Sequence, residues 1–340
     1  MNVAVVGAGS WGTAIAWLLG SKGVKTALWA RSEAVTTAIT RDRRNPRYLS
    51  DVVLPETVTS TNDLEEAVRG AGVVVFATPS HAVRDTAVAL APFLTPEALC
   101  VSLAKGLEKD TALRMTEVIA REAATMARTA ALSGPNHAEE VSKGIPSTTV
   151  IAAYDDEVGR ALREIFTTPT FRVYTNPDVV GVELCGASKN VIAIAAGMSD
   201  GLGYGDNTKS SLMTRGLSEM SRLGRALGAN PLTYMGLAGM GDLIATCTSV
   251  HSRNRGLGET IARGGTIEDF YEKTHMVAEG ALSAIAVDDL ARAHGIEMPI
   301  TRLVRAILYE GESCEAAVGA LMTRTATDEL HGMGLGLDEE

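Results

Sequence analysis

Several features of common protein classes are missing from these 340 residues. No basic tract offsets the formal net charge of −10, which disfavours nucleic acid as a general partner. No uninterrupted apolar run reaches eighteen residues, so we predict no membrane span. The N-terminus lacks the charged region of a signal peptide, and the four cysteines form no C-x-x-C pair. These absences favour a cytoplasmic protein with reduced thiols and no metal site.

What is present is the composition of an ordinary globular protein, with 46% hydrophobic and 21% charged residues. The length allows two domains with substantial cores. Strand and helix patterns alternate up to about residue 175, and only helical patterns follow. We therefore predict an α/β domain with a doubly wound, mainly parallel sheet over residues 1–175 and an all-α domain over residues 176–330. Residues 331–340 are expected to form a flexible tail.

The first glycine-rich segment lies between an apolar strand and an apolar helix. Residues 3–6 form the strand pattern, and Gly7, Gly9 and Gly12 follow in G-x-G-x-x-G register. Gly7 permits a tight turn, Gly9 lets the backbone approach a pyrophosphate, and Gly12 lets the helix pack near the strand. The pattern predicts a Rossmann-like dinucleotide site with phosphates at the helix N-terminus. An ordinary glycine-rich turn is the alternative.

The end of the next expected strand, residues 24–30, bears on the choice of dinucleotide. NAD sites carry an Asp or Glu there to bond the ribose 2′-hydroxyl, whereas this chain has Arg31. A guanidinium pairs with a 2′-phosphate, so Arg31 favours NADP(H), with NAD(H) also open. Alternatively, Arg31 is a solvated loop charge. The polar segment 41–55 is expected as a loop whose basic residues lie beside the phosphates or simply on the surface.

Two later junctions also join a strand to polar residues. Lys105 follows the strand expected at 99–103, at the edge where open α/β sheets bind ligands. The segment Ser-Gly-Pro-Asn at 133–136 follows the strand expected at 129–132 and precedes a helix. Its N–H groups are therefore candidates to meet a nicotinamide or a substrate.

A lysine in an apolar helix is the sharpest anomaly of the second half. The helix expected over 179–198 is apolar or small on nearly all sides, with Lys189 in its middle. Desolvation lowers the pKa of a buried lysine, which suits it for proton transfer. The alternative is a snorkelling or ion-paired structural lysine. Asp242 follows a glycine and precedes apolar residues, so it either orients Lys189, accepts a substrate hydroxyl, or caps a helix.

Three consecutive polar residues lie near another expected helix start. Ser252, Arg253 and Asn254 supply a hydroxyl, a guanidinium fork and an amide. Such a set suits a phosphate group, because a helix N-terminus and charge-assisted hydrogen bonds both stabilise an anion. A solvated turn is the alternative.

With these motifs the chain resembles the NAD(P)-dependent sn-glycerol-3-phosphate dehydrogenases of the bacterial type, from the N-terminal glycine motif to about residue 325. The resemblance rests on A-K-G-L-E at 104–108, G-P-N-H-A-E-E-V at 134–141, K-N at 189–190, G-L-A-G-M-G-D-L at 236–243 and H-S-R-N-R at 251–255. It implies reversible reduction of dihydroxyacetone phosphate to sn-glycerol 3-phosphate, the glycerophospholipid backbone. It also implies NADP(H) or NAD(H) as cofactor and a homodimer.

The resemblance implies roles for individual residues as well. Lys189 is the implied general acid and base. The implied substrate residues are Lys105, Gly134, Asn136, Asp242, Ser252, Arg253 and Asn254. The implied cofactor residues are Gly7, Gly9, Ser10, Trp11, Gly12, Arg31, Tyr48, Lys105, Ala138, Arg253, Val277 and Glu279. Asn136 stands where the family often has Ser or Thr, and we expect altered affinity rather than lost activity because an amide also donates and accepts.

Two other functions stay open at this point. Another β-hydroxyacid-type dehydrogenase is disfavoured by the phosphate-suited residues 252–254. A dinucleotide-binding sensor without catalysis is disfavoured by the joint presence of Lys105, Lys189 and Asp242. The choice between NAD and NADP, the oligomeric state and feedback inhibition are not determined by the sequence.

Overall fold

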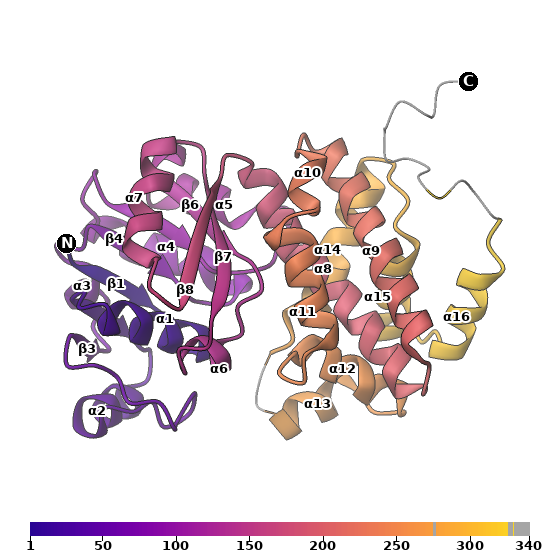
Figure 1. The fold of residues 1–340 in the computed structure, drawn as a ribbon, viewed down its shortest axis with the longest axis horizontal. Helices are drawn as coiled ribbons and strands as arrows, with labels where there is room; N and C mark the ends of the chain where they lie inside the picture. Colours follow the sequence, from indigo (N-terminus) through magenta and orange to yellow (C-terminus); the bar gives the residue numbers. More distant parts are fainter. Residues whose placement is uncertain (275–276, 326–328, 330–340) are drawn as a thin grey trace. The chain divides into compact units, whose positions relative to one another are not determined.

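The computed structural model describes residues 1–274, 277–325 and 329. The chain divides into two compact units (Figure 1). The first comprises Met1–Glu108 and Leu113–Glu183, and the second comprises Lys109–Ala112 and Leu184–Glu340. The tail expected at residues 331–340 lies outside the described residues.

The first unit is built on an eight-stranded sheet with the order β3-β2-β1-β4-β5-β6-β7-β8. Its strands are β1 Val3–Val6, β2 Thr26–Trp29, β3 Val58–Thr61, β4 Val73–Phe76, β5 Leu99–Ser102, β6 Thr129–Ser133, β7 Ser147–Ala153 and β8 Phe171–Asn176. All neighbouring strands pair in parallel except β6 and β7, which are antiparallel. The prediction of a doubly wound, mainly parallel sheet is therefore confirmed.

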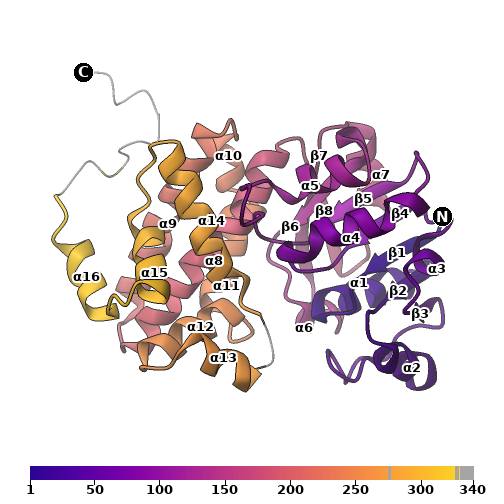
Figure 2. The same ribbon diagram turned by 180° about the vertical axis from the view of Figure 1, so that it is seen from behind.

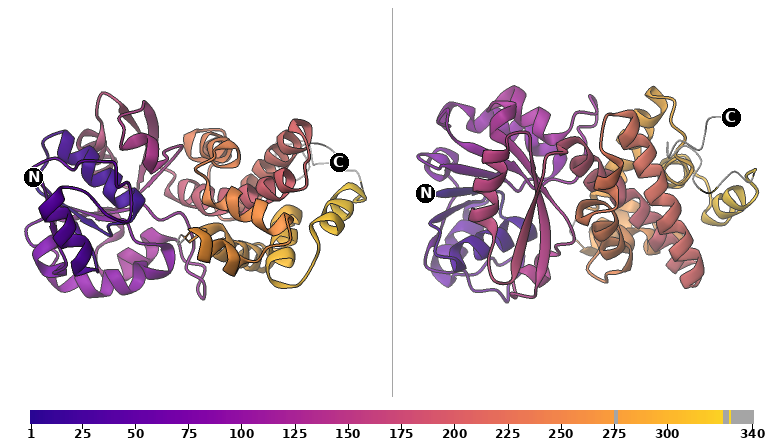
Figure 3. Two further views of the ribbon diagram at one scale, coloured as in Figure 1. Left: turned by 90° about the horizontal axis from the view of Figure 1, so that it is seen from below. Right: turned by 45° about the horizontal axis from the view of Figure 1, so that its top comes forward.

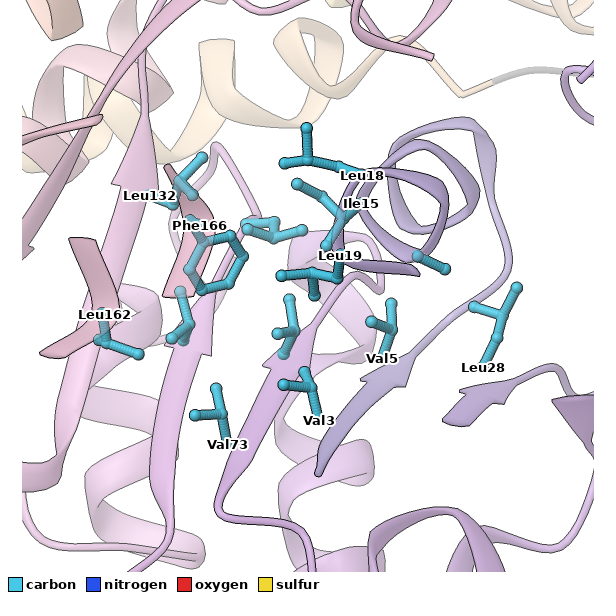
Figure 4. Close-up of a cluster of buried hydrophobic side chains, with 14 of the residues drawn as sticks. Val3, Val5, Ile15, Leu18, Leu19, Leu28, Val73, Leu132, Leu162 and Phe166 are labelled. Atoms are coloured by element: carbon cyan, nitrogen blue, oxygen red, sulfur yellow. The ribbon is translucent and has the colours of Figure 1, made fainter. Parts of the chain in front are cut away.

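Helices cover both faces of this sheet. They are α1 Ser10–Ser21, α2 Glu33–Asp42, α3 Leu64–Val68, α4 Val83–Leu90, α5 Met115–Glu122, α6 Ala138–Val141 and α7 Asp156–Phe166, together with short 3-10 turns at Ser80–Ala82, Ala91–Phe93 and Met126–Arg128. On one face, Ile15 and Leu19 of α1 and Phe166 of α7 bury against the strands (Figure 4). On the other face, α3, α4 and α5 cover the sheet (Figure 2). This layering explains why the central strands are apolar on both sides.

Two elements near residues 33–61 differ from the sequence prediction. Helix α2 extends into the segment expected as a loop from residue 41, and β3 was not predicted. Helix α2 buries little beyond Val35, Thr36 and Ile39. Strand β3 is an edge strand with Val58 as its buried residue. An element that buries so few side chains has few apolar residues at regular spacing. The sequence then gives little sign of a helix or strand, and the segment resembles a loop.

The described residues of the second unit form helices joined by loops and contain no strand, as predicted (Figure 3). Its helices are α8 Val179–Gly201, of which residues 179–183 fall in the first unit, α9 Asp206–Ala226, α10 Pro231–Tyr234, the π-helical turn η4 Leu237–Gly241, α11 Asp242–Thr248, α12 Arg253–Ala262, α13 Ile267–Thr274, α14 Glu279–Ala293, α15 Pro299–Tyr309 and α16 Cys314–Met322. Helix α8 is long and apolar enough to cross a membrane by length and composition, but 94% of its apolar window is buried. Burial on nearly all sides identifies α8 as a core helix.

Candidate functional site

The glycine loop after β1 is shaped by two kinds of glycine. Gly7 has φ +118°, and a Cβ there would lie 2.8 Å from the Ala77 carbonyl oxygen. A Cβ at Gly12 would overlap the carbonyl oxygen of Gly7, so both residues are required by the packing of the loop itself. A Cβ at Gly9 would meet no described heavy atom within 4 Å. The structure therefore leaves open space at Gly9, which fits the approach of a pyrophosphate at the N-terminus of α1.

This loop lies where the strand order of the sheet reverses. The chain proceeds from β1 to β2 and β3 on one side and returns to β4 on the other side of β1. The glycine loop and the segment after β4 meet there, because Ala77 donates its N–H to the Val6 carbonyl at 2.9 Å. Open α/β sheets bind ligands at such a switch point. The Thr78 hydroxyl is buried there without a hydrogen-bond partner among the described residues, as expected of a group that serves a ligand.

The other residues expected at the dinucleotide have varied surroundings. Ser10 begins α1, and the Trp11 ring packs 6.4 Å from that of Phe171. The Trp11 indole N–H is buried without a partner in the described part of the chain. Arg31 is exposed just beyond β2, and Tyr48 is half-buried in the loop that follows α2. The open Gly9, the buried N–H and the exposed cation all fit a bound dinucleotide.

Lys105 joins two of the residues expected at the substrate. Its Nζ donates to the Gly134 carbonyl at 3.0 Å and to Asn136 Oδ1 at 3.2 Å. The Asn136 amide donates in turn to Thr149 Oγ1 at 2.9 Å, and Thr149 donates to the Ser133 carbonyl. The segments after β5 and β6 are thus bound together by the lysine. Thr149 was missed from the sequence because it lies inside β7, where threonine is common.

Ala138, expected at the nicotinamide, occupies the first position of helix α6 and is buried. His137 precedes it as the helix N-cap residue, with extended backbone. The junction of strand, loop and helix predicted at residues 129–141 is therefore present. Helix α6 spans only Ala138–Val141, so its N-terminus alone supports no anion site.

Lys189 is 4% exposed in the middle of α8 and forms a buried ion pair with Asp242. Its Nζ donates to Asp242 Oδ1 at 2.9 Å and to Thr246 Oγ1 at 2.6 Å. The Thr246 hydroxyl donates to the Asp242 carbonyl at 2.6 Å, one turn earlier in α11. The carboxylate stabilises the ammonium form of Lys189, and both partners fix the position of the amine. Such a group can hold and release a proton at a defined point.

The π-helical turn η4 sets the start of helix α11. It ends at Gly241, and Asp242 is the first residue of α11 rather than its N-cap, contrary to one of the alternatives. Gly239 packs against the backbone of Tyr234 so closely that a Cβ would overlap it. Thr246 follows Asp242 by four residues, so both side chains face Lys189. That i, i+4 spacing is the sequence pattern by which Thr246 could have been found.

A nearby thiol can be excluded from acid–base chemistry. Burial raises the pKa of Cys247 to about 12, although the charge of Lys189 opposes this effect. The thiol is therefore protonated at neutral pH and packs as a small apolar group. The described residues hold no group of three or more His, Cys, Asp or Glu side chains arranged for a metal ion.

Ser252, Arg253 and Asn254 lie at the start of α12, as the sequence predicted, but they face different surroundings. Ser252 is the N-cap, and its Oγ accepts the Arg255 N–H at 3.2 Å. Arg253 is exposed, whereas Asn254 is 8% exposed. The exposed guanidinium at a helix N-terminus fits an anionic group.

Asn254 connects three helices of the second unit. Its Nδ2 donates to Asn190 Oδ1 on α8, and its Oδ1 accepts the N–H of Gly280 on α14, both at 2.9 Å. Glu279 begins α14, and Val277 precedes it, both half-buried. The amide network therefore places the N-terminus of α14 relative to the residue that follows Lys189 in the chain.

Comparison with known proteins gives consistent matches over nearly the whole chain. A model described as the N-terminus of NAD-dependent glycerol-3-phosphate dehydrogenase matches residues 2–159, and one described as its C-terminus matches residues 178–319. A glycerol-3-phosphate dehydrogenase (NAD(P)+) from Moorella thermoacetica is 50% identical over 329 residues, which cover 97% of this chain and 98% of that relative. One from Pelotomaculum thermopropionicum is 48% identical over 336 residues, covering 98% of this chain and 96% of the relative.

A solved structure shows the same similarity in three dimensions. The crystal structure of glycerol-3-phosphate dehydrogenase from Coxiella burnetii matches with a TM-score of 0.91 and 37% sequence identity. The match covers 95% of this chain and 99% of that chain. The match therefore includes both units of this chain.

Proposed function

The chain belongs to the NAD-dependent glycerol-3-phosphate dehydrogenase family, and we propose that its reaction uses Lys189 as the proton donor and acceptor. As a member, it is an oxidoreductase that reduces dihydroxyacetone phosphate to sn-glycerol 3-phosphate with NAD(P)H. The observation that carries the proposal for Lys189 is its buried ion pair with Asp242. A buried charge is costly, and Asp242 and Thr246 hold this one in position.

In the direction of reduction, Lys189 acts at the carbonyl oxygen of the substrate. The bound nicotinamide supplies the hydride that reaches the carbonyl carbon. Negative charge then grows on the oxygen, and the Lys189 ammonium stabilises it and transfers a proton to it. Asp242 and Thr246 hold the amine throughout, and solvent returns the proton afterwards. In the direction of oxidation, the neutral amine accepts the hydroxyl proton.

We assign the substrate phosphate to the N-terminus of α12. Support comes from the exposed Arg253 guanidinium and from the hydroxyl of Ser252, the N-cap residue of this helix. We assign a further polar contact to Lys105, whose ammonium is held at the ends of β5 and β6 by the Gly134 carbonyl and Asn136. The Asn136 amide is hydrogen-bonded to Lys105 and Thr149. Asn136 therefore influences the affinity for the substrate by positioning Lys105.

We assign the dinucleotide to the switch point of the sheet, with the pyrophosphate at Gly9 and the adenosine end near Arg31. The open space at Gly9 and the unpartnered Thr78 hydroxyl support the first assignment. The exposed cation after β2, where an acidic residue would select NAD, supports NADP(H) as the preferred cofactor. Steady-state constants for NADPH and NADH with dihydroxyacetone phosphate decide this preference.

We also propose a homodimer located in the cytoplasm, feeding glycerophospholipid synthesis. The cytoplasmic assignment is supported by the four free cysteines, all of which are buried. The homodimer and the role in lipid synthesis rest on the family resemblance. Light scattering during size-exclusion chromatography measures the oligomeric state directly.

The proposed roles are tested by exchanging one cation at a time. Lys189→Ala removes the proton donor, so kcat falls by at least ~10²-fold while the KM for NADPH changes little. Arg253→Ala removes the phosphate contact, so the KM for dihydroxyacetone phosphate rises most. Lys25→Ala makes the same substitution as the first variant at an exposed position directly before β2, at the end of the strand opposite Arg31, and serves as the control.

Each outcome has a distinct meaning. Near-normal turnover of the Lys189→Ala variant contradicts the role of this lysine. An Arg253→Ala variant that weakens only cofactor binding contradicts the phosphate assignment. A wild-type protein that binds NADPH without oxidising it in the presence of dihydroxyacetone phosphate would instead be the sensor considered above.

A further inference from the structure

Asn45 is a fully buried polar residue in a segment that is otherwise at the surface. Its exposed fraction is 0%, whereas its neighbours Arg44 and Pro46 and the nearby Arg47 are exposed. A buried carboxamide is tolerated when its donors and acceptors are satisfied. The position is therefore built for the hydrogen bonds that this side chain makes.

All four hydrogen-bonding positions of the Asn45 amide are used. Nδ2 donates to the Ala8 carbonyl and to Thr13 Oγ1, both at 2.9 Å. Oδ1 accepts the N–H groups of Arg47 at 3.0 Å and Tyr48 at 3.2 Å. One end of the amide thus contacts the glycine loop and helix α1, and the other end shapes the loop at residues 45–49.

The bond to Ala8 fixes the orientation of a peptide group in the glycine loop. In a planar trans peptide, the carbonyl and the following N–H point in opposite directions. The Ala8 carbonyl points at Asn45, so the N–H of Gly9 points away from it. A phosphate that approaches the loop from the side opposite Asn45 therefore meets the Gly9 N–H donor rather than the Ala8 carbonyl, whose dipole would repel it.

The Asn45 amide also stabilises the loop at residues 45–49, which contains an uncommon backbone conformation. Leu49 has φ +55°, a left-handed conformation that is uncommon for a side chain of this kind. The turn over Arg47 and Tyr48 is closed by the two N–H bonds to Asn45 Oδ1, in the manner of an Asx turn. Tyr48 is therefore attached to the glycine loop through one side chain.

We propose that Asn45 is a positioning residue of the dinucleotide site, which orients the Ala8–Gly9 peptide toward the pyrophosphate and holds Tyr48 beside the glycine loop. The inference rests on the proposed binding of a dinucleotide at residues 7–12. Asn45 touches no reacting group and acts through the backbone that it orients. Its effect is expected on cofactor affinity rather than on the hydride or proton transfer.

Asn45→Asp is the sharpest test, because it keeps the shape and the acceptor Oδ1 but replaces two donated hydrogens by negative charge. The carboxylate repels the Ala8 carbonyl, so we expect the dissociation constant for NADPH to rise at least ~10-fold. The kcat at saturating NADPH stays within a few-fold of the wild type. Asn45→Ala tests the same bonds without added charge, and Thr13→Val removes one partner on α1.

Asn2→Asp is the matched control, since it makes the same chemical change at an exposed position before β1. A second ligand distinguishes a specific effect on the Ala8–Gly9 peptide from a general distortion of the dinucleotide site. Adenosine 2′-monophosphate lacks the pyrophosphate, so its affinity is expected to be unchanged in Asn45→Asp. Fluorescence titration with both ligands, together with thermal melting, gives the comparison.

Equal weakening of both ligands, or an NADPH affinity within twofold of the wild type, overturns the inference. Folding failure of Asn45→Ala leaves the test to Asn45→Asp and Thr13→Val. Failure of all three variants to fold would show that Asn45 is required for the fold, and would also overturn the positioning role. Failure of the proposed function is separate, because the wild-type protein itself would then not bind NADPH or NADH.

Discussion

At the scale of single residues, the three glycines of one motif serve two different purposes. Gly7 and Gly12 are required by contacts inside the protein, as their missing Cβ atoms would meet backbone at Ala77 and Gly7. Gly9 has extended backbone angles that any residue adopts and open space in the described structure around it. Glycine there caps α1 better than alanine by on the order of 1 kcal/mol, and the open space beside it also leaves room for a ligand.

This difference predicts opposite behaviour for two alanine substitutions. Gly9→Ala lowers the melting temperature by no more than about 4 °C, since the N-cap change costs on the order of 1 kcal/mol. It weakens NADPH binding by at least ~10-fold, because a methyl group occupies the path of the pyrophosphate. Gly12→Ala forces the backbone apart and lowers the melting temperature by much more. Calorimetry and titration of both variants make the measurement, and equal destabilisation would contradict it.

At the scale of secondary-structure elements, a buried carboxylate joins two helices of the second unit. Glu219 on α9 is 2% exposed and accepts the N–H groups of Ile300 and Thr301 at 2.7 Å and 3.2 Å. These are the first donors of α15, because Pro299 has no N–H. Burial raises the pKa of Glu219 to about 7, against the lowering effect of these hydrogen bonds.

The raised pKa predicts a pH-dependent stability. Between about pH 4.5 and 7, the folded state holds a proton on Glu219 that the unfolded state has released. This contribution therefore stabilises the fold at low pH and is lost as the pH rises through that window. Glu219→Gln cannot ionise, so the free energy of unfolding of the wild type should fall relative to this variant between pH 5 and 8, by on the order of a few kcal/mol at most.

Chemical denaturation at several pH values measures this difference. Glu97→Gln, at an exposed position, is the control that should track the wild type at every pH. Parallel stability profiles of wild type and Glu219→Gln would contradict the assignment of this titration to Glu219.

At the scale of the whole molecule, the residues assigned to the two ligands belong mostly to different units. The glycine loop, Arg31 and Tyr48 are in the first unit, whereas Lys189 and Asp242 are in the second. Each unit has its own buried core, which holds the assigned residues of that unit in place.

We therefore expect the two ligands to slow amide hydrogen exchange in different parts of the chain. NADPH slows exchange of amides at residues 9–13, and sn-glycerol 3-phosphate slows exchange at residues 242–256. The reason is that a ligand bound to the native state suppresses local opening around its site, with about 2.7 kcal/mol expected at 100 times the dissociation constant. Protection by sn-glycerol 3-phosphate confined to residues 9–13 would contradict the assignment.

The sequence by itself determined the fold class, the glycine motif and the helical character of the second half. Strands such as β1 and β4 bury every residue, so their apolar runs are unambiguous. It also identified Lys189 as anomalous, because one charge stands out in an apolar helix. Edge elements such as β3 and α2 were missed, since an element that buries few side chains carries little pattern.

Only the tertiary structure decided which residues meet. Lys189 and Thr246 are 57 positions apart and Asn45 and Ala8 are 37 apart, and no periodicity in the chain reports such contacts. Asn45 and Thr78 look like ordinary polar residues until the surrounding atoms show which of their hydrogen bonds are made. Burial patterns are local in sequence, whereas hydrogen-bond partners are set by how distant segments pack.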